Sequence, residues 1–397
     1  MEKSRKPKIR FKGYNDDWEQ RKLGDIMNIA SVKRIHQSDW TDSGIRFLRA
    51  RDIVSASKNE EPDDYLYISK EKYDEYSLTS GKVAIGDLLV TGVGTIGVPY
   101  LIRNSEPMYF KDGNIIWFQN GTKIDGDFFL YSFSGKAIQD FINESAGIGT
   151  VGTYTIESGK KTPISLPKMK EQQKIGACFH NIDNLITLHQ RKLEKLMNVK
   201  KSMLEKMFPK QGSVVPEIRF CGFTDAWEQR KVQDVADRFD NLRIPVAANL
   251  RVHGTTPYYG ANGIQDYVDG FTHDGEFVLV AEDGANDLKN YPVKCVNGRV
   301  WVNNHAHVLQ GKARIADNSF LAFAISQSDI ESLLVGGGRA KLNAENLMSI
   351  EFRLPCLQEQ YQIGEYLSQL DNLITLHQRK LEKLKNIKKS MLEKMFI

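Results

Sequence analysis

Two long stretches of the chain carry apolar residues at every third or fourth position, the first from about Glu171 and the second from about Glu359. This spacing places the apolar side chains along one face of an α-helix. No Pro or Gly interrupts residues 177–208, and about 37 helical residues would extend for about 55 Å. Each apolar stripe is too narrow for a core helix, so we expect the two helices to pack on each other. The expected contact residues of this helical spacer are Ile182, Ile186, Leu193, Leu196, Met203, Ile374, Leu381, Leu384 and Met391.

The two helical stretches are near-identical copies. Asn184–Phe208 reads NLITLHQRKLEKLMNVKKSMLEKMF, and Asn372–Phe396 repeats it with two substitutions. Residues 9–26 likewise match residues 218–235 at 11 of 18 positions, including an identical WEQRK, and the pattern LPxxxEQxxIG precedes both helices. A period this long is not that of a solenoid, whose repeats span about 20–50 residues. The pattern predicts a duplicated domain.

The segments between the repeated pieces differ from each other and read as β-structure. Short apolar runs such as IRFLRARDI and NIIWFQ in the first half, and EFVLVAE and RVWVNNHAHVLQ in the second, are separated by Gly, Asn, Asp and Pro. GDLLVTGVGTIGVPYLI and GEFVLVAEDGANDLKNYPVKCV resemble one strand-loop-strand unit with different loops. We predict an α+β fold: two domains with irregular, mostly antiparallel sheets and two long, coiled-coil-like helices. The expected segments are 1–160 (domain 1), 161–210 (helical region 1), 211–348 (domain 2) and 349–397 (helical region 2).

Charge is concentrated in the repeated helices. The net charge is only +4, but the two 25-residue copies together hold +9, which leaves −5 for the remainder. Four scattered cysteines without CxxC spacing argue against disulfides and zinc. No run approaches the ~20 apolar residues of a membrane span, and MEKSRKPKIRF has no apolar signal region. We expect a protein of the reducing cytoplasm without a membrane partner.

Motifs for catalysis are weak or missing from the sequence. Gly92, Gly94 and Gly97 spell GxGxxG, but VPYLIR follows instead of the helix that would hold a pyrophosphate, which favours a glycine-rich hairpin or bulge. The P-loop pattern GxxxxGK[ST] and the methyltransferase tetrapeptide NPPY do not occur. His305 and His307 form a close pair, yet alternate strand histidines more often pack or hydrogen-bond than bind metal. We therefore predict no catalytic residue, no metal site and no cofactor on this chain.

The repeated frame resembles the specificity subunit of type I restriction-modification enzymes. The resemblance rests on the WEQRK entry segments, the LPxxxEQxxI motifs and the doubled NLITLHQRKLEKL helices, and it covers essentially the whole chain. It implies that the two variable domains are target-recognition domains, each binding one half of a split, asymmetric site in double-stranded DNA. It also implies that the repeated helices pair antiparallel, separate the two domains in a pseudo-twofold arrangement and dock two modification subunits, with restriction subunits joining the complex. S-adenosylmethionine, ATP and Mg²⁺ would then belong to those partner subunits.

Candidate DNA contacts follow from the chemistry of phosphates and base edges. Arg and Lys suit phosphates and guanine, and Asn suits adenine. Arg49 and Arg51 are our first choices in domain 1, because they alternate along a predicted strand. Each candidate has an alternative interpretation as a surface or turn residue. The remaining candidates are Lys33, Arg34, Thr95, Lys111 and Asn114 in domain 1 and Asn262, Lys289, Asn290, Asn303, Asn304, His305, Arg339 and Lys341 in domain 2.

The helix lysines, including Lys388 and Lys389, have two interpretations. They can contact phosphate, or they can solvate the helices and dock an acidic partner subunit, which we favour. Two DNA-binding domains on a stiff spacer could contact segments one or more helical turns apart, about 34 Å per turn. The alternative class is a stand-alone DNA-binding or scaffold protein without restriction-modification partners. Neighbouring genes for a methyltransferase and a translocase would distinguish the two.

Overall fold

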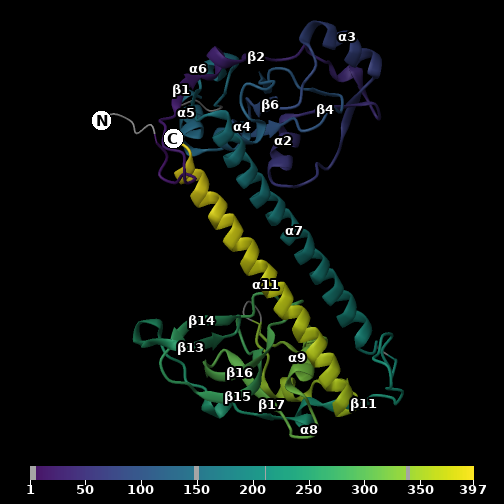
Figure 1. Ribbon diagram of the computed structural model, residues 1–397. Helices are drawn as coiled ribbons and strands as arrows, with labels where there is room; N and C mark the ends of the chain where they lie inside the picture. The colour runs from purple at the N-terminus through teal and green to yellow at the C-terminus, as the bar shows by residue number, and fades with distance from the viewer. Residues whose placement is uncertain (1–5, 147–151, 211, 337–339) are drawn as a thin grey trace. The chain divides into compact units, whose positions relative to one another are not determined.

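The computed structural model describes residues 6–146, 152–210, 212–336 and 340–397, and the chain divides into two compact units. Unit 1 consists of Met1–Arg191 with Arg379–Ile397, and unit 2 of Lys192–Gln378. Both units include parts of two helices of 39 residues, α7 (Met169–Met207) and α11 (Leu357–Met395) (Figure 1). Each unit therefore holds the first part of one long helix and the last part of the other. The segments expected to end at residues 160, 210 and 348 are continuous in the sequence and keep each long helix in one piece. The compact units instead divide each long helix between them.

The described residues of unit 1 form three small sheets. One pairs β1 (Glu19–Lys22) with β10 (Pro163–Leu166), and a second has the all-antiparallel order β2-β9-β6-β7. The third has the order β3-β5-β4-β8, in which β4 and β8 are parallel. Their strands are β2 (Asn28–Ala30), β3 (Trp40–Thr41), β4 (Ile45–Leu48), β5 (Leu66–Ile68), β6 (Leu88–Thr91), β7 (Pro99–Leu101), β8 (Met108–Phe110) and β9 (Ile115–Gln119). The helices are α1 (Leu23–Ile26), α2 (Ala50–Ser57), α3 (Lys70–Ser80), α4 (Gly126–Phe133), α5 (Lys136–Ser145) and α6 (Ile156–Lys161), with the 3-10 turn η1 (Gln37–Asp39).

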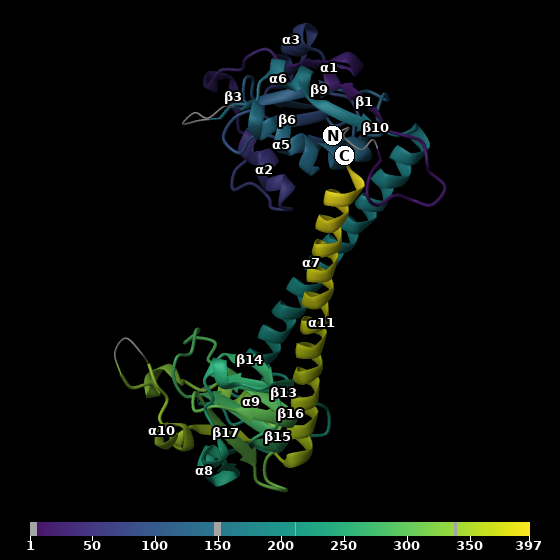
Figure 2. The ribbon, with the colours of Figure 1, turned by 90° about the vertical axis from the view of Figure 1, so that its left-hand side faces the viewer.

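Unit 2 contains a six-stranded sheet, whereas unit 1 contains two four-stranded sheets. Its order is β12-β17-β15-β16-β13-β14, and β13 and β16 are its parallel pair. Helix α9 (Asn318–Ser326) lies against β15 and β16 (Figure 2). A separate pair joins β11 (Glu228–Lys231) and β18 (Glu351–Leu354). The sheet strands are β12 (Ala236–Arg238), β13 (His253–Gly260), β14 (Gly263–Val268), β15 (His273–Ala281), β16 (Val293–Val302) and β17 (Ala306–Gly311). The remaining elements are α8 (Val232–Val235), α10 (Ala344–Ser349), η2 (Asp240–Leu242), η3 (Ala248–Leu250) and η4 (Glu331–Leu333).

These elements confirm the α+β prediction with irregular, mostly antiparallel sheets. The two strand-loop-strand segments also correspond as expected, because β6 pairs antiparallel with β7 and β15 with β16. One expectation was wrong: the run IRFLRARDI is not a single strand. Strand β4 ends at Leu48, Arg49 is the N-cap of α2, and Arg51 lies inside that helix. Asp52 accepts a bond from the Arg49 backbone N–H, which favours helix initiation over a continued strand.

The repeated EQ motif anchors each long helix to the chain's entry segment. Arg10 donates two hydrogen bonds to the carboxylate of Glu171, at 2.6 and 2.8 Å, and the Glu171 residue is 1% exposed. Arg219 binds Glu359 in the same way, at 2.7 and 2.8 Å. Such bidentate pairs fix both position and orientation. The IRF and EQ motifs recur together because they form one contact in each unit.

The glutamine and glycine that follow this glutamate position a second helix. Gln172 donates to the Pro167 carbonyl at 2.8 Å and accepts from the Asp125 N–H at 3.1 Å, just before α4. A Cβ on Gly176 would lie 2.7 Å from the backbone nitrogen of Phe128, so only glycine allows this approach. In unit 2 the equivalent contacts use Gln360, Asp317 and Gly364, at the start of α9.

The core of unit 1 is completed by the end of α11. Phe396 is 8% exposed, and its ring centroid lies 5.6 Å from that of Phe128 and 5.6 Å from that of Phe179. Lys388 binds Asp183 at 2.7 Å. Because residue numbers rise along α7 as they fall along α11, the two helices run antiparallel here.

Unit 2 repeats this construction with the end of α7. Phe208 packs 5.5 Å from Phe320 and 6.1 Å from Trp227, between ring centroids. Lys200 binds Asp371 at 2.5 Å, which is the same pair of repeat positions with the roles of the two helices exchanged. Each core thus contains apolar residues from both copies of the repeat.

The predicted spacer residues are placed as follows. Ile186 is buried on α7 in unit 1. Leu196 and Met203 pack against the unit 2 core, and Met391 packs against the unit 1 core. Their assigned role as a spacer stays a prediction. The others are partly buried: Ile182, Leu193, Ile374, Leu381 and Leu384. Over the described residues, no helix is both long and apolar enough to cross a membrane.

We expect Phe396→Ala to destabilise unit 1 selectively, by about 3–5 kcal/mol, because it removes a buried ring from a packed aromatic cluster. Hydrogen-exchange mass spectrometry should show lost protection in β6 and β9 but unchanged protection in β15. The matched Phe208→Ala variant should give the reverse pattern. Equal loss of protection in both units for either variant would contradict this division of the core.

Candidate nucleic-acid interface

The loops that follow β6 and β15 occupy equivalent places in the two units. Tyr154 donates its backbone N–H to the Gly92 carbonyl at 2.9 Å, and Leu342 donates to the Glu282 carbonyl at 2.7 Å. In both units a second loop is therefore held against the first residue after the strand. Gly94 and Gly97 have φ of +71° and +75°, and Gly97 donates its N–H to the Thr91 carbonyl at 2.8 Å. The GxGxxG sequence is consequently a turn between two strands, as the sequence indicated.

Three DNA-binding candidates of unit 2 meet at the end of β15. Lys341 binds Glu282 at 2.8 Å, and His305 Nδ1 lies 2.5 Å from Asp283. The Asn262 side chain donates to the Gly284 carbonyl at 2.9 Å. Residues far apart in the sequence therefore surround one three-residue segment, which makes this loop the best-defined candidate surface of unit 2.

The other candidates of unit 2 lie elsewhere. Asn303 is 4% exposed, and its side-chain oxygen accepts the His305 N–H at 2.8 Å, so it holds a turn. Asn304 is exposed in the same turn, and this turn corrects the expectation that His305 lies in a strand. Lys289 and Asn290 form a turn in which Asp287 accepts both backbone N–H groups. Arg339 lies outside the described residues.

In unit 1, Arg49 and Arg51 converge on one carboxylate. Both guanidinium groups bind Asp64, at 2.8 and 2.6 Å, and Arg49 also binds Asp52 at 2.9 Å. The Arg49 side chain is 14% exposed and that of Arg51 is 63% exposed. Burial lowers the pKa of Arg49, but its bonds to Asp52 and Asp64 raise it more; the bond from Arg49 in turn lowers the pKa of Asp64. Arg51 is therefore the more accessible candidate, and Arg49 supports the loop.

The remaining candidates of unit 1 form two groups. Arg34 binds Asp112 at 2.8 Å, and Lys111 lies 4.0 Å from the same carboxylate. Lys33 sits 3.8 Å from Glu75 and over the ring of Tyr76. Thr95 lies in the loop after β6, where its carbonyl accepts the Thr91 hydroxyl. Asn114 lies directly before β9, and its carbonyl accepts the N–H of Gly92 in that loop. DNA contact by each of these residues stays a prediction.

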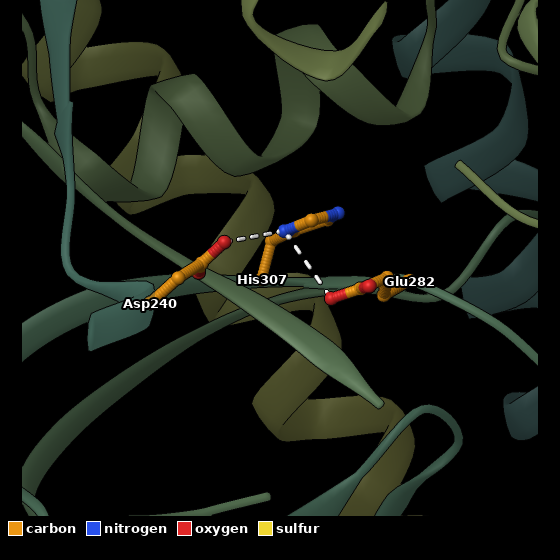
Figure 3. A group of neighbouring side chains, drawn as sticks. All are labelled: Asp240, Glu282 and His307. Carbon is orange, nitrogen blue, oxygen red and sulfur yellow. Dashed lines mark hydrogen bonds and ion pairs between the residues drawn. The ribbon is translucent and has the colours of Figure 1, made fainter. Parts of the chain in front are cut away.

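A buried ion-pair network beneath the unit 2 loop was not predicted from the sequence. His307 Nδ1 lies 2.7 Å from Asp240 Oδ2 and 3.7 Å from Glu282 Oε2 (Figure 3). Arg243 binds Glu282 at 2.6 Å and donates to the Ala306 carbonyl at 2.9 Å. The network connects η2, the end of β15 and β17. No local signal marks it, because Asp240, Glu282 and His307 are separated from one another by tens of residues in the sequence.

The histidine and two carboxylates have the residue types of a metal site, but their partners favour an ion-pair network. Their potential ligand atoms lie within 4.8 Å of one another. However, Glu282 already faces the cations of Arg243 and Lys341. Both His307 nitrogens also face acceptors, because Nε2 lies 2.9 Å from the Leu342 carbonyl. Two acceptors are satisfied only when both ring nitrogens carry hydrogen, which leaves no lone pair for a metal.

The network changes the acidity of its two carboxyl groups. Burial raises the pKa of Asp240, but the bonds from His307 and from the Val308 N–H lower it more, so the net shift is downward. Burial likewise raises the pKa of Glu282, and the bonds from Lys341 and Arg243 reverse that shift. Both groups are therefore held ionised at neutral pH, which stabilises the cations around them.

The sequence matches a family model described as the type I restriction modification DNA specificity domain. The match occurs twice, over residues 15–198 and 224–386, and so covers most of both units and most of both long helices. The chain belongs to this family. The two matched regions correspond to the two halves of the internal duplication.

Individual relatives agree with the assignment to the specificity family. A protein of Haemophilus influenzae named as a type I restriction enzyme specificity subunit is 44% identical over 146 residues, which is 37% of this chain and 38% of that relative. A Methanocaldococcus jannaschii protein named as the MjaX specificity subunit is 23% identical over 95% of this chain and 92% of its own length. The crystal structure of the type I restriction-modification S subunit from M. genitalium has a similar fold, with a TM-score of 0.71, 99% coverage of both chains and 14% identity.

For this specificity chain, we expect Arg51→Ala to weaken DNA binding by up to about tenfold without changing stability. Arg49→Ala should instead destabilise the loop after α2, since it leaves Asp52 buried without its arginine. Fluorescence anisotropy with target DNA and thermal unfolding would measure the two effects. Equal DNA affinity for Arg51→Ala and the unchanged protein would remove Arg51 from the candidates.

We expect Asp240→Asn to destabilise unit 2 by about 2–4 kcal/mol at neutral pH, because it removes the carboxylate that the buried His307 ring contacts at 2.7 Å. The native pKa of Asp240 is depressed, so its stabilising effect is present above the unfolded value of about 3.9 and is lost as pH falls through the native pKa. Denaturant unfolding of both proteins should therefore give a stability difference that shrinks toward acidic pH. A difference independent of pH would contradict the ion-pair account.

Proposed function

We propose that this chain is the DNA-recognition subunit of a type I restriction-modification complex, and that each unit binds one half of a bipartite, asymmetric site. The observation that carries this proposal is that the same frame occurs in both units but holds different sheets, two of four strands in unit 1 and one of six in unit 2. Both units contain the same Arg–Glu ion pair and the same glutamine and glycine contacts at the start of a long helix. In both units the end of the other long helix also packs in the core. The strands mounted on them differ in number and order. A shared frame with different reading domains suits a split site with two unlike halves.

The candidate contacts support a recognition surface in each unit. In both units the loop after the equivalent strand, β6 or β15, is held by a second loop from later in the sequence. Cationic and amide side chains gather near the unit 2 loop, which is the residue chemistry that reads phosphates and base edges. We propose that these two loops face DNA. Because the units differ in the side chains there, each unit would select a different base sequence.

We propose two roles for α7 and α11, namely setting the spacing between the half-sites and docking two modification subunits. The family assignment and the near-identical helix sequences support the second role, since two copies of one surface suit two copies of one partner. Methyl transfer from S-adenosylmethionine and ATP- and Mg²⁺-dependent steps would then reside on modification and restriction subunits. The chain itself would act without catalysis, by placing those subunits on DNA.

Co-expression of the chain with its modification subunits, followed by methylome sequencing, tests the proposal. We expect one split motif with unlike halves, methylated in both halves. A palindromic or continuous motif, or no new methylation, would overturn it. Substitution of exposed candidates in one unit, such as Arg51→Ala, should alter only one half of the motif.

A matched pair of insertions tests the spacer. Seven residues inserted after Lys192 in α7 and seven after Lys380 in α11, which are equivalent positions, add about 10 Å to each helix. We expect the same two half-sites with a gap wider by about three base pairs, at about 3.4 Å per base pair. An unchanged gap in an active complex would show that the helices do not set the spacing.

A further inference from the structure

His305 lies in the turn before β17, with its ring beside the loop that follows β15. Its Nδ1 lies 2.5 Å from Asp283 Oδ1, and the His305 side chain is 37% exposed. An ionised carboxylate can only accept hydrogen bonds, so the hydrogen of this contact is on Nδ1. In a neutral imidazole the other nitrogen, Nε2, then carries a lone pair and accepts hydrogen bonds. Asp283 therefore fixes which nitrogen His305 offers to a ligand and in which role.

Two buried histidines of the same sheet use both of their ring nitrogens. His307 Nδ1 lies 2.7 Å from Asp240, and its Nε2 lies 2.9 Å from the Leu342 carbonyl. His273 is engaged in the same way, by a hydroxyl at 2.7 Å and by a backbone carbonyl at 3.1 Å. His305 differs from both, because its Nε2 has no partner among the residues that the structure describes. The fold thus orients the His305 ring and leaves one polar atom available to a contact from outside.

The backbone of His305 is held at both of its polar groups. Its N–H donates to the Asn303 side-chain oxygen, and its carbonyl accepts the Glu282 N–H, each at 2.8 Å. Asn303 is 4% exposed and donates its own N–H to the Tyr259 carbonyl at 3.1 Å. The Glu282 carboxylate is anchored by Arg243 at 2.6 Å. A ring positioned in this way loses little conformational freedom when it makes a directional contact, which favours selective binding.

The neighbouring DNA-contact candidates of this loop have other tasks. Asn262 donates to the Gly284 carbonyl and accepts the Asn286 N–H, each at 2.9 Å, so both ends of its amide hold the loop. Lys341 pairs with Asp283 in a short antiparallel bridge, and the lysine side chain is 46% exposed. A lysine there suits a phosphate, and phosphate contacts carry no sequence information. The directional contact with a base is therefore left to the histidine held by Asp283.

We propose that His305 Nε2 contacts a base edge in the major groove and accepts a hydrogen bond from an exocyclic amino group. Adenine N6 and cytosine N4 present such donors there, whereas thymine O4 and guanine O6 are acceptors. A fixed acceptor selects the amino group and disfavours the keto oxygen, because two facing acceptors share no hydrogen. His305 would thus select the orientation of one base pair in the unit 2 half-site. This inference rests on the proposed function and deepens it by naming the group that is recognised.

Methylome sequencing of cells that express the chain with its modification subunits tests the role of His305. We expect His305→Ala to relax one position of one half-site, so that the base pair is accepted in both orientations. The other half-site should stay unchanged, which also reports a folded and active complex. The matched control is His253→Ala, which replaces an exposed histidine of β13 in the same unit and should leave the motif unaltered. An unaltered motif for His305→Ala would overturn the proposal.

Binding of base analogues by the purified complex identifies the group that His305 contacts. Fluorescence anisotropy would be measured with DNA that lacks one amino group of this half-site at a time, with purine in place of adenine and 2-pyrimidinone in place of cytosine. We expect one such removal to weaken binding about three- to tenfold for the unsubstituted chain and to have no such effect for His305→Ala. Matched analogues that lack a keto oxygen complete the set. Dependence of the His305 effect on a keto oxygen, or on no base group, would contradict the proposal.

Asp283→Asn tests the positioning role of the carboxylate. An amide can donate as well as accept, so the His305 ring is no longer confined to one tautomer. We expect the preference between the two orientations of the base pair to fall, because DNA with the reversed pair gains affinity relative to the original. Equal loss of affinity for both orientations would show a purely structural role and overturn this part of the proposal.

The outcomes separate the two levels of inference. A split motif in which no position responds to His305→Ala would leave the proposed function standing and overturn the assignment of His305. Absence of a split motif for the unsubstituted chain would overturn the proposed function itself.

Discussion

The structure depends on one constraint, which is that neither unit can close its hydrophobic core without the end of a helix from the other repeat. Phe396 enters the aromatic cluster of unit 1, and Phe208 enters that of unit 2. These rings are attached to the last turns of α11 and α7, so each long helix must continue from its own joint into the other core. The near-identity of the helices follows from this constraint, because both copies meet the same kind of pocket and the same Asp–Lys pair.

At the start of each long helix, the contacts of a glutamate, a glutamine and a glycine form a joint with the entry segment and with α4 or α9. This joint explains why short motifs far apart in the sequence recur together. Glutamate fixes the entry arginine, glutamine fixes the start of α4 or α9, and glycine lets that helix start approach closely. The repeated WEQRK strand pairs with the strand that leads into the same joint. This frame leaves the remaining strands free to differ, which is visible in the two four-stranded sheets of unit 1 and the six-stranded sheet of unit 2.

On the surfaces proposed to contact DNA, the cations available to a phosphate depend more on which of them are paired with carboxylates than on their number. Arg49, Arg34 and Lys341 all look like phosphate ligands in the sequence, yet each one is held by a carboxylate in the fold. Such pairs position a cation and also lower its availability to an outside anion. The contact between Asp240 and the buried His307 lies beneath the loop after β15, so the shape of this loop also depends on largely buried residues.

The sequence by itself determined the duplication, the two long helices and the α+β class, because periodicity and repeated motifs are local signals that survive without coordinates. It also indicated that GxGxxG is a turn, since a strand and not a helix follows it. It misplaced Arg49 and Arg51, because a bond from one carboxylate to a backbone N–H turns an apparent strand into a helix start. Only the tertiary structure could decide which helix end completes which core, which cations are paired and which histidine nitrogens have partners. These features depend on residues up to about two hundred positions apart, and no local pattern in a sequence records such distances.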